Sequence, residues 1–355
     1  MDVQRPANSA EPVSLPWTFG FSKLLGVSAL HTDTRNKVYG ISLQIMSIII
    51  LCLWVRTSNV FVEKTLNGFV FGFVHTITTY NAVIYMVCSW RNKEKVVKAM
   101  SLLNTLTSDG ICNCEIFLIV FTWSTLLTMI ALDLLLDQKD LFILHLENFV
   151  YYFPLLQILI ASNQFVVLVL TATHRLNVLL SKVEPNQSIE PKSIIHDYNT
   201  LYESCQLINE TYSFPNLITI IRHGLACAFT SYYFVMAALN LFPPHIAKKK
   251  LWLSSCSVIC FFAYIANIFR VCQITQTKAK KFEIAFYDRI SSDPAHKELF
   301  LSRPIYKKIK FSAYNVFTIN YKAFNGIVTT LITYQVILLQ FALTNVSSET
   351  YQETS

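Results

Sequence analysis

Seven stretches of the chain are apolar enough, and long enough, to cross a lipid bilayer as helices. A helix rises about 1.5 Å per residue, so roughly 20 apolar residues match the ~30 Å hydrocarbon core. The predicted spans are 38–55, 66–90, 115–136, 148–173, 223–242, 251–270 and 323–345. We therefore expect an all-α membrane protein with seven transmembrane helices, whose two termini lie on opposite sides of the membrane.

The last predicted span carries a stripe of polar residues. Thr330, Thr333, Gln340 and Thr344, with Ile337 between them, follow one another at steps of three and four residues. This spacing places them on one face of a helix, which we call the polar stripe. Because a Gln side chain facing acyl chains is penalised, the stripe is expected to face other helices or water. It fits interhelical hydrogen bonds within one bundle or the wall of a pore built from several copies of this helix.

The composition is that of a membrane protein rather than a soluble enzyme. The 355 residues are 53% hydrophobic and only 14% charged, whereas a soluble domain carries nearly twice that charge. None of the eight glycines lies in a GxGxxG or GxxxxGK pattern, which argues against a nucleotide-binding fold. The basic residues that give the net charge of +7 lie in the segments between the predicted spans. We therefore expect no nucleic-acid partner. We also expect no cofactor.

The distribution of basic residues predicts the orientation in the membrane. Of the 29 Lys and Arg residues, 23 fall in the segments on one side of the predicted spans and six on the other. Basic residues near the ends of spans concentrate on the cytoplasmic side. The expected layout is a cytoplasmic N-terminal segment (1–37), spans one to six (38–270), a cytoplasmic segment (271–322), the last helix (323–345) and an extracellular tail (346–355).

This orientation decides between other classes with seven spans. A G-protein-coupled receptor has the opposite orientation, and its Asp-Arg-Tyr and Asn-Pro-x-x-Tyr motifs are missing from the expected places. An inverted seven-span zinc hydrolase needs histidines that converge on one metal ion, but the eight histidines contain no HxxxH pair. We therefore predict no catalytic residue and no metal site. A monomeric carrier or a metal-dependent membrane enzyme remains the alternative.

Two predicted helices extend into the cytoplasm. Apolar residues repeat at helical spacing from Ile194 to Tyr212 and again across 273–290, so each segment has an apolar face that needs a partner. That partner lies either within the same subunit or in a neighbouring one.

The extracellular halves of spans two to six are rich in aromatic and polar residues. Such a mixture suits a small amphiphilic ligand, although Trp and Tyr also gather at membrane interfaces without binding anything. The candidate ligand-binding residues are His75, Thr79, Asp133, Asn148, Tyr151, Tyr152, Tyr232, Tyr233, Trp252 and Ser255.

The last span also carries a short motif. Thr333-Tyr334 is followed, after five residues, by Gln340-Phe341, and this resembles the TYxxxxxQF signature of insect gustatory receptors. The preceding run, 311–320, is similar to that family's approach to its last helix. The resemblance implies a ligand-gated, nonselective cation channel in the plasma membrane of gustatory or other chemosensory neurons, surrounded by membrane lipid.

The resemblance also implies an assembly and a set of pore residues. Four subunits, of one kind or mixed with related receptors, would place this helix around a central pore, with the cytoplasmic helices forming an anchor domain. Ile337 resembles the hydrophobic constriction of the related odorant receptors. The ligand would be a small-molecule tastant, and Gln335, where sugar-sensing branches often carry Glu, favours a bitter or plant-derived compound without excluding a sugar. The implied pore and gate residues are Thr333, Tyr334, Ile337, Gln340, Phe341 and Thr344.

Overall fold

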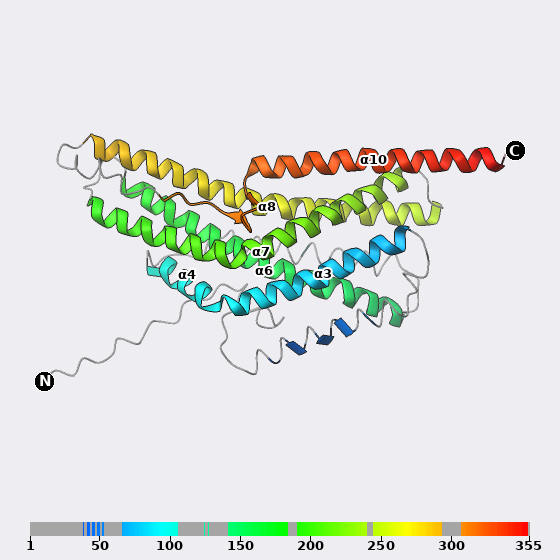
Figure 1. The fold of residues 1–355 in the computed structure, drawn as a ribbon, viewed down its shortest axis with the longest axis horizontal. Coiled ribbons are helices and arrows are strands. Elements are labelled where there is room, and N and C mark those ends of the chain that lie inside the picture. Colours follow the sequence, from blue (N-terminus) through cyan, green and yellow to red (C-terminus); the bar gives the residue numbers. More distant parts are fainter. Residues whose placement is uncertain are drawn as a thin grey trace.

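The computed structural model describes residues 66–105, 141–183, 190–239, 244–292 and 307–353, with scattered positions between 38 and 52 and at 124 and 127. Several side chains at helix ends, including those of 141–151, 244–250 and 341–353, lie outside this description. The elements are α3 (Leu66–Arg91), α4 (Lys93–Thr105), α6 (Leu141–Lys182), α7 (Pro191–Ala238), α8 (Pro244–Ser291), β1 (Ser312–Ala313), β2 (Phe317–Thr318) and α10 (Tyr321–Glu353) (Figure 1).

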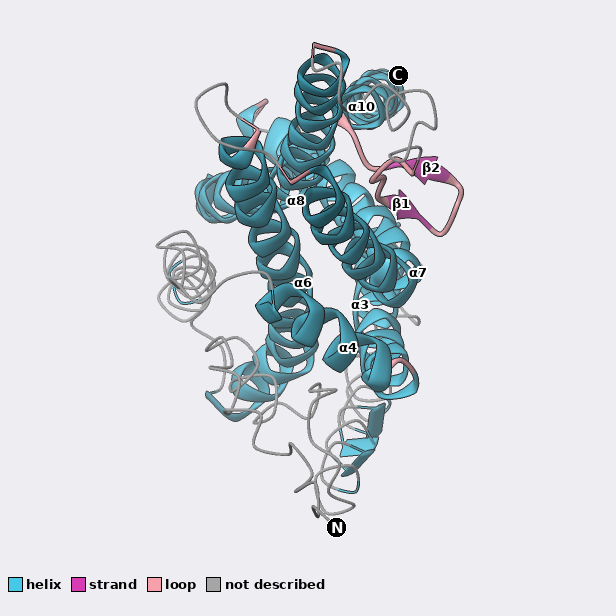
Figure 2. Cartoon of the chain, turned by 90° about the vertical axis from the view of Figure 1, so that its left-hand side faces the viewer, coloured by secondary structure: helices cyan, strands magenta, loops and turns pink. Residues whose placement is uncertain are grey.

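The described helices form one elongated bundle. α3, α6, α7 and α8 pack along one another, and α4 continues beyond the end of α3 and packs against α7 (Figures 1 and 2). Their shared core is apolar and aromatic: Tyr85, Phe165 and Phe269 are fully buried within it. Because lipid chains are as apolar as these side chains, close van der Waals packing and not removal from water holds the helices together where they cross the membrane.

α7 and α8 are each 48 residues long, about twice the length that a bilayer requires. Each joins a predicted span to the amphipathic segment that is predicted to lie in the cytoplasm. α7 begins at Pro191, where the missing N–H costs no helical hydrogen bond, and it contains Pro215. Proline inside a helix removes one backbone hydrogen bond and bends the axis, and α7 bends near its middle (Figure 1).

A short antiparallel hairpin, 311–319, immediately precedes α10. Ser312 pairs with Thr318 and Ala313 with Phe317. Tyr314 and Asn315 have φ angles of 48° and 59°, which makes the tight turn whose twist matches paired strands. A left-handed tyrosine costs about 1–2 kcal/mol. The contact of its ring with Phe214 of α7, at 5.0 Å between centroids, offsets part of that cost.

α10 lies at the edge of the bundle, beside α7 and α8 (Figures 1 and 2). Asn320 begins it, because its Oδ1 accepts the backbone N–H of Ala323 at 2.9 Å. Phe324, Ile327 and Leu331 pack on the core from one side of the helix. The other side is exposed, and none of the apolar window within Tyr321–Gln340 is buried.

The predicted helices agree with the structure wherever it describes them. Helix covers 66–90, 148–173, 251–270 and 323–345 completely and 223–238 of the fifth predicted span, and three described helices are long and apolar enough to cross a membrane. α6 is longer than predicted at both ends, and α10 continues to Glu353, beyond residue 345. The predicted spans 38–55 and 115–136 lie almost entirely outside the described residues.

Candidate functional site

The polar stripe of α10 points away from the rest of the chain. Thr330, Thr333, Ile337 and Gln340 are all exposed, on the side opposite Ile327 and Leu331, which face the core. Ile337, an apolar side chain, is 40% exposed. The described members of the stripe therefore do not pack into the core of the bundle. The side chain of Thr344, its last member, lies outside the described residues.

The threonines near the start of the stripe are satisfied within the helix. The hydroxyls of Thr329, Thr330 and Thr333 each donate to the carbonyl oxygen four residues earlier, at 3.0, 2.9 and 3.0 Å. Their oxygen lone pairs remain available on the exposed side. Gln335, by contrast, faces the bundle and donates to the Ala228 carbonyl of α7. Two glutamines of one helix thus lie in different settings, because Gln340 is on the exposed face.

A second set of polar side chains lies inside the bundle, where α3, α6, α7 and α8 meet. The Tyr85 hydroxyl is its centre: it lies 2.7 Å from Ser162 Oγ, donates to Asn216 Oδ1 at 3.1 Å and accepts from the Thr219 hydroxyl at 3.1 Å. Asn81 Nδ2 also donates to Thr219 Oγ1, at 3.1 Å. We call the following residues the bundle cluster: Thr78, Asn81, Tyr85, Ser162, Asn216, Thr219, Arg222, His223 and Tyr264.

The bundle cluster contains a buried cation. Arg222 is only 1% exposed; its Nε donates to Thr78 Oγ1 at 3.1 Å, and its guanidinium lies 5.0 Å from the centre of the Phe261 ring. A cation over an aromatic face is stabilised by the ring's negative surface, and more strongly away from water. The count of loop charges in the sequence includes Arg222 on the cytoplasmic side. The structure instead buries it, so it does not belong in that count.

His223 stacks on Tyr264, with ring centroids 4.7 Å apart. Its Nδ1 lies 2.8 Å from the carbonyl oxygen of Thr219. A carbonyl only accepts, so Nδ1 carries the proton and Nε2 of the neutral ring is an acceptor. Within the described part of the chain, His223 Nε2, Asn81 Oδ1 and Thr79 Oγ1 have no hydrogen-bond partner. These buried atoms could hydrogen-bond a small polar molecule.

The comparisons with known proteins place the chain in a family. The family model described as 7tm chemosensory receptor matches residues 16–345. The chain therefore belongs to the 7tm chemosensory receptor family. This family comprises membrane receptors rather than enzymes.

Solved structures share the receptor's fold. The insect olfactory receptor OR5 from Machilis hrabei matches with a TM-score of 0.72 at 12% identity, covering 92% of this chain and 97% of the other. The same protein in complex with eugenol matches with a TM-score of 0.71 at 12% identity, covering 91% and 97%. A search of curated protein sequences found no match. The resemblance to chemosensory receptors is thus confirmed at the level of the family and the fold.

The receptor's predicted ligand-binding residues differ in burial where the structure describes their side chains. Thr79 and Tyr152 are buried, and Thr79 is next to Thr78 of the bundle cluster. Tyr232 and Tyr233 are half-buried and lie ring to ring at 5.9 Å near the end of α7. Trp252 is exposed, and Ser255 donates to its own helix at Leu251.

The remaining predicted residues lie partly or wholly outside the description. His75, Asn148 and Tyr151 are in helices, but their side chains are not described; the same holds for Phe341 of the motif. Asp133 lies outside the described residues altogether. Their roles stay predictions.

The bundle cluster was not predicted, although the receptor's sequence carries a signal for it. Thr78, Asn81 and Tyr85 follow one another at steps of three and four, and so do Asn216, Thr219 and His223. This is the same spacing that reveals the polar stripe of α10. Among the described residues, no group of His, Cys, Asp and Glu could hold a metal ion.

Proposed function

We propose that this receptor is a ligand-gated, nonselective cation channel of the gustatory type, in which four copies of α10 surround a pore. One observation carries the proposal: the polar stripe lies on the side of α10 that its own chain leaves uncovered. In lipid, glutamine and threonine on such a face would be penalised. Around a shared axis, the same residues would line a path for hydrated ions.

The composition of the stripe favours a channel of low selectivity. It contains threonine hydroxyls, one glutamine and one isoleucine, and no acidic residue or TVGYG-like carbonyl filter. Neutral dipoles of this kind stabilise cations without strongly distinguishing among them. Ile337 is the apolar member of the stripe, and a ring of four isoleucines would close the pore by excluding water.

The orientation in the membrane is proposed from the basic residues. Omitting the buried Arg222 leaves a large excess of Lys and Arg on the side of the N-terminus, which supports a cytoplasmic N-terminus and an extracellular C-terminus. On intact cells, an antibody should reach an epitope at the C-terminus and should reach one at the N-terminus only after permeabilisation. The reverse staining would contradict this orientation.

The ligand we propose is a small, neutral, bitter or plant-derived molecule that binds within the bundle. The acceptors Asn81 Oδ1 and His223 Nε2, with the aromatic rings of Phe261 and Tyr264 beside them, suit a molecule that combines a hydroxyl with a ring. The related olfactory receptor was solved with eugenol, a phenol, which makes eugenol a sensible first compound. A sugar remains the second candidate, because Gln335 is only a weak discriminator.

Patch clamp of this protein expressed alone tests the proposal. Eugenol, a set of bitter compounds and a set of sugars are applied in turn to expressing and to mock-transfected cells. We expect at least one compound to evoke a current that sodium, potassium and calcium all carry, and only in expressing cells. The mass of the purified protein should be about four times the 40.7 kDa of one chain. A strict monomer that passes no current would favour the alternative of a carrier or a membrane enzyme.

A further inference from the structure

We propose that Asn209, in the cytoplasmic half of α7, is a positioning residue of the gate. It holds the hairpin 311–319, and through it the first turn of α10, to the helix that carries much of the bundle cluster. The inference rests on the proposed channel function, since a gate exists only if α10 lines a pore.

The side-chain amide of Asn209 forms hydrogen bonds to the hairpin through both its oxygen and its nitrogen. Its Oδ1 accepts the backbone N–H of Ser312 at 2.8 Å, and its Nδ2 donates to Ser312 Oγ at 3.3 Å. Asn209 and Ser312 are both half-buried. Two hydrogen bonds that include a backbone group fix position and direction together, which one flexible contact cannot do.

The hairpin is also held from α6 and α8. Phe311 is fully buried and meets Phe165 of α6 edge to face, with centroids 6.0 Å apart. Gln276 of α8 donates to the Ile319 carbonyl at 3.0 Å. The start of the hairpin is therefore attached to α6 and α7 and its end to α8, so a movement of α7 relative to α8 must act on the hairpin.

The same contacts continue into α10. Phe269 of α8 stacks with Phe317 of the hairpin at 6.4 Å and packs against Phe324 of α10 at 5.5 Å. The backbone N–H of Tyr321 donates to Gln273 Oε1 at 3.3 Å, and Asn320 caps the helix. The hairpin and the base of α10 are thus both held to α8, and they follow each other directly in the chain at residues 319 and 320. A movement of the hairpin therefore acts on the first turn of the pore helix.

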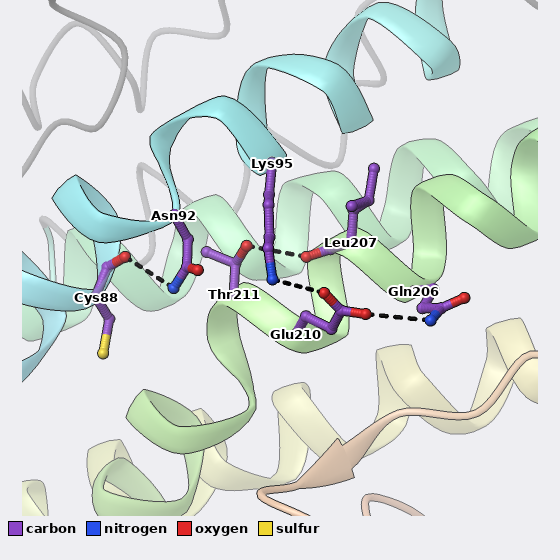
Figure 3. Close-up of polar contacts among 7 residues, drawn as sticks. All are labelled: Cys88, Asn92, Lys95, Gln206, Leu207, Glu210 and Thr211. Carbon is purple, nitrogen blue, oxygen red and sulfur yellow. Dashed lines mark hydrogen bonds and ion pairs between the residues drawn. The ribbon is translucent and has the colours of Figure 1, made fainter.

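α7 connects this clamp to the bundle cluster. Asn216, Thr219 and Arg222 lie on the same helix, about two to four turns beyond Asn209, with the helix-bending Pro215 between them and Asn209. Next to Asn209, Glu210 pairs with Lys95 of α4 at 2.7 Å (Figure 3). One turn of α7 therefore contacts both α4 and the hairpin. A ligand that shifts α7 within the bundle would move α10 through Asn209.

The test uses the full-length receptor and three substitutions in α7. Asn209→Ala removes both hydrogen bonds, and Asn209→Asp keeps the acceptor for the Ser312 N–H. Asn199→Ala is the matched control, because Asn199 is an exposed asparagine of the same helix. Each protein is measured in two ways: hydrogen–deuterium exchange of the Ser312 amide in lipid nanodiscs, and single-channel recording with a fixed mixture of eugenol, caffeine and sucrose.

We expect Asn209→Ala to raise exchange at Ser312 about five- to tenfold and to lower the evoked open probability by a similar factor, as the loss of two hydrogen bonds implies. The current through one open channel should not change, because Asn209 does not line the pore. Asn209→Asp should recover most of both effects, and Asn199→Ala should match the natural protein. A merely structural role would lower the amount of receptor at the cell surface without this rescue.

Each other outcome contradicts a distinct claim. Unchanged exchange in Asn209→Ala would overturn the clamp, whether or not the channel conducts. Raised exchange with a normal evoked open probability would overturn the positioning role. If the natural protein passes no current with the mixture, the proposed channel function fails and takes the positioning role with it, while the exchange data still show whether Asn209 holds the hairpin.

Discussion

α6 and α10 are both apolar enough to cross a membrane, yet they lie in opposite surroundings. Within α6, 83% of the apolar window is buried by the same chain, whereas none of the corresponding window of α10 is. α3, α7 and α8 surround α6, while α10 lies against α7 and α8 on one side only. Hydrophobicity alone therefore does not say what a span faces.

The polar residues of the two helices show what the difference means. Ser162 of α6 bonds Tyr85 of α3, and Gln164 accepts from the Tyr212 hydroxyl of α7 at 3.4 Å. On the exposed face of α10, the threonine hydroxyls bond their own helix. Polar groups inside α6 specify the packing of one subunit. The exposed threonines of α10 keep oxygen lone pairs available to water, ions or other subunits.

The largest effect, on the current without ligand, is expected from truncating the apolar side chain of the polar stripe. Ile337→Ala should raise the current without ligand by about tenfold or more, because a narrower apolar side chain no longer excludes water from the pore. Phe341→Ala, at the motif's last position, should leak in the same way, whereas Gln340→Ala should chiefly alter permeation. Ile332→Ala is the control, since Ile332 is an exposed isoleucine on another face of α10. Whole-cell recording at rest measures all four.

If both apolar variants are silent at rest and respond normally to ligand, the gate is elsewhere. The polar stripe would then have only a structural role. α10 would differ from α6 only in being covered by lipid or by another subunit instead of by its own chain.

A smaller effect should follow from removing hydrogen bonds of the bundle cluster, inside the subunit. Tyr85→Phe removes a hydroxyl that bonds Ser162, Asn216 and Thr219, and it leaves their polar groups buried with fewer partners. We expect a loss of about 1–3 kcal/mol in the free energy of unfolding, measured by thermal denaturation in detergent. Tyr334→Phe, at an exposed position of α10, should cost less than about 0.5 kcal/mol. Equal costs for the two would mean that the bundle cluster contributes no more than a surface tyrosine.

The smallest effect concerns an ion pair outside the membrane. The Lys95 ammonium bonds the Glu210 carboxylate and lowers its pKa below the ordinary value of 4.5. The pair's contribution is therefore complete above that ordinary pKa and is lost as the pH falls through the lowered one. Because both side chains are more than one third exposed, we expect less than about 1 kcal/mol. Glu210→Gln should destabilise slightly at neutral pH, and the difference should disappear as the pH falls below the lowered pKa; a difference that does not change with pH would contradict the role of the charge.

The sequence predicted the helices well because their signals are local. Apolar runs of the right length gave the described spans, and spacing by three and four gave the polar stripe before any fold was known. The same spacing at Thr78, Asn81 and Tyr85 was available, but its meaning depends on which helices meet. Residues 138 positions apart, such as Asn81 and Thr219, bond each other, and no local pattern predicts that pairing.

The hairpin was missed for a different reason. Its turn is formed by Tyr314 and Asn315 rather than by the Asn-Gly or Gly-rich pairs that identify such turns in a sequence. Contacts with Phe214 and Asn209 of α7 hold it instead. Tertiary contacts thus determine a turn that local propensity would not predict.

Accessibility of introduced cysteines to a charged thiol reagent tests the central claim, that the exposed stripe of α10 lines a pore, most directly. In a background whose current the reagent does not affect, Thr333→Cys lies on the stripe, Ile332→Cys on the neighbouring exposed face and Leu331→Cys toward the core. The account predicts that a positively charged methanethiosulfonate irreversibly reduces the ligand-evoked cation current at position 333 and leaves the currents at 331 and 332 unchanged. Block at position 331 or 332 with position 333 unaffected would contradict it.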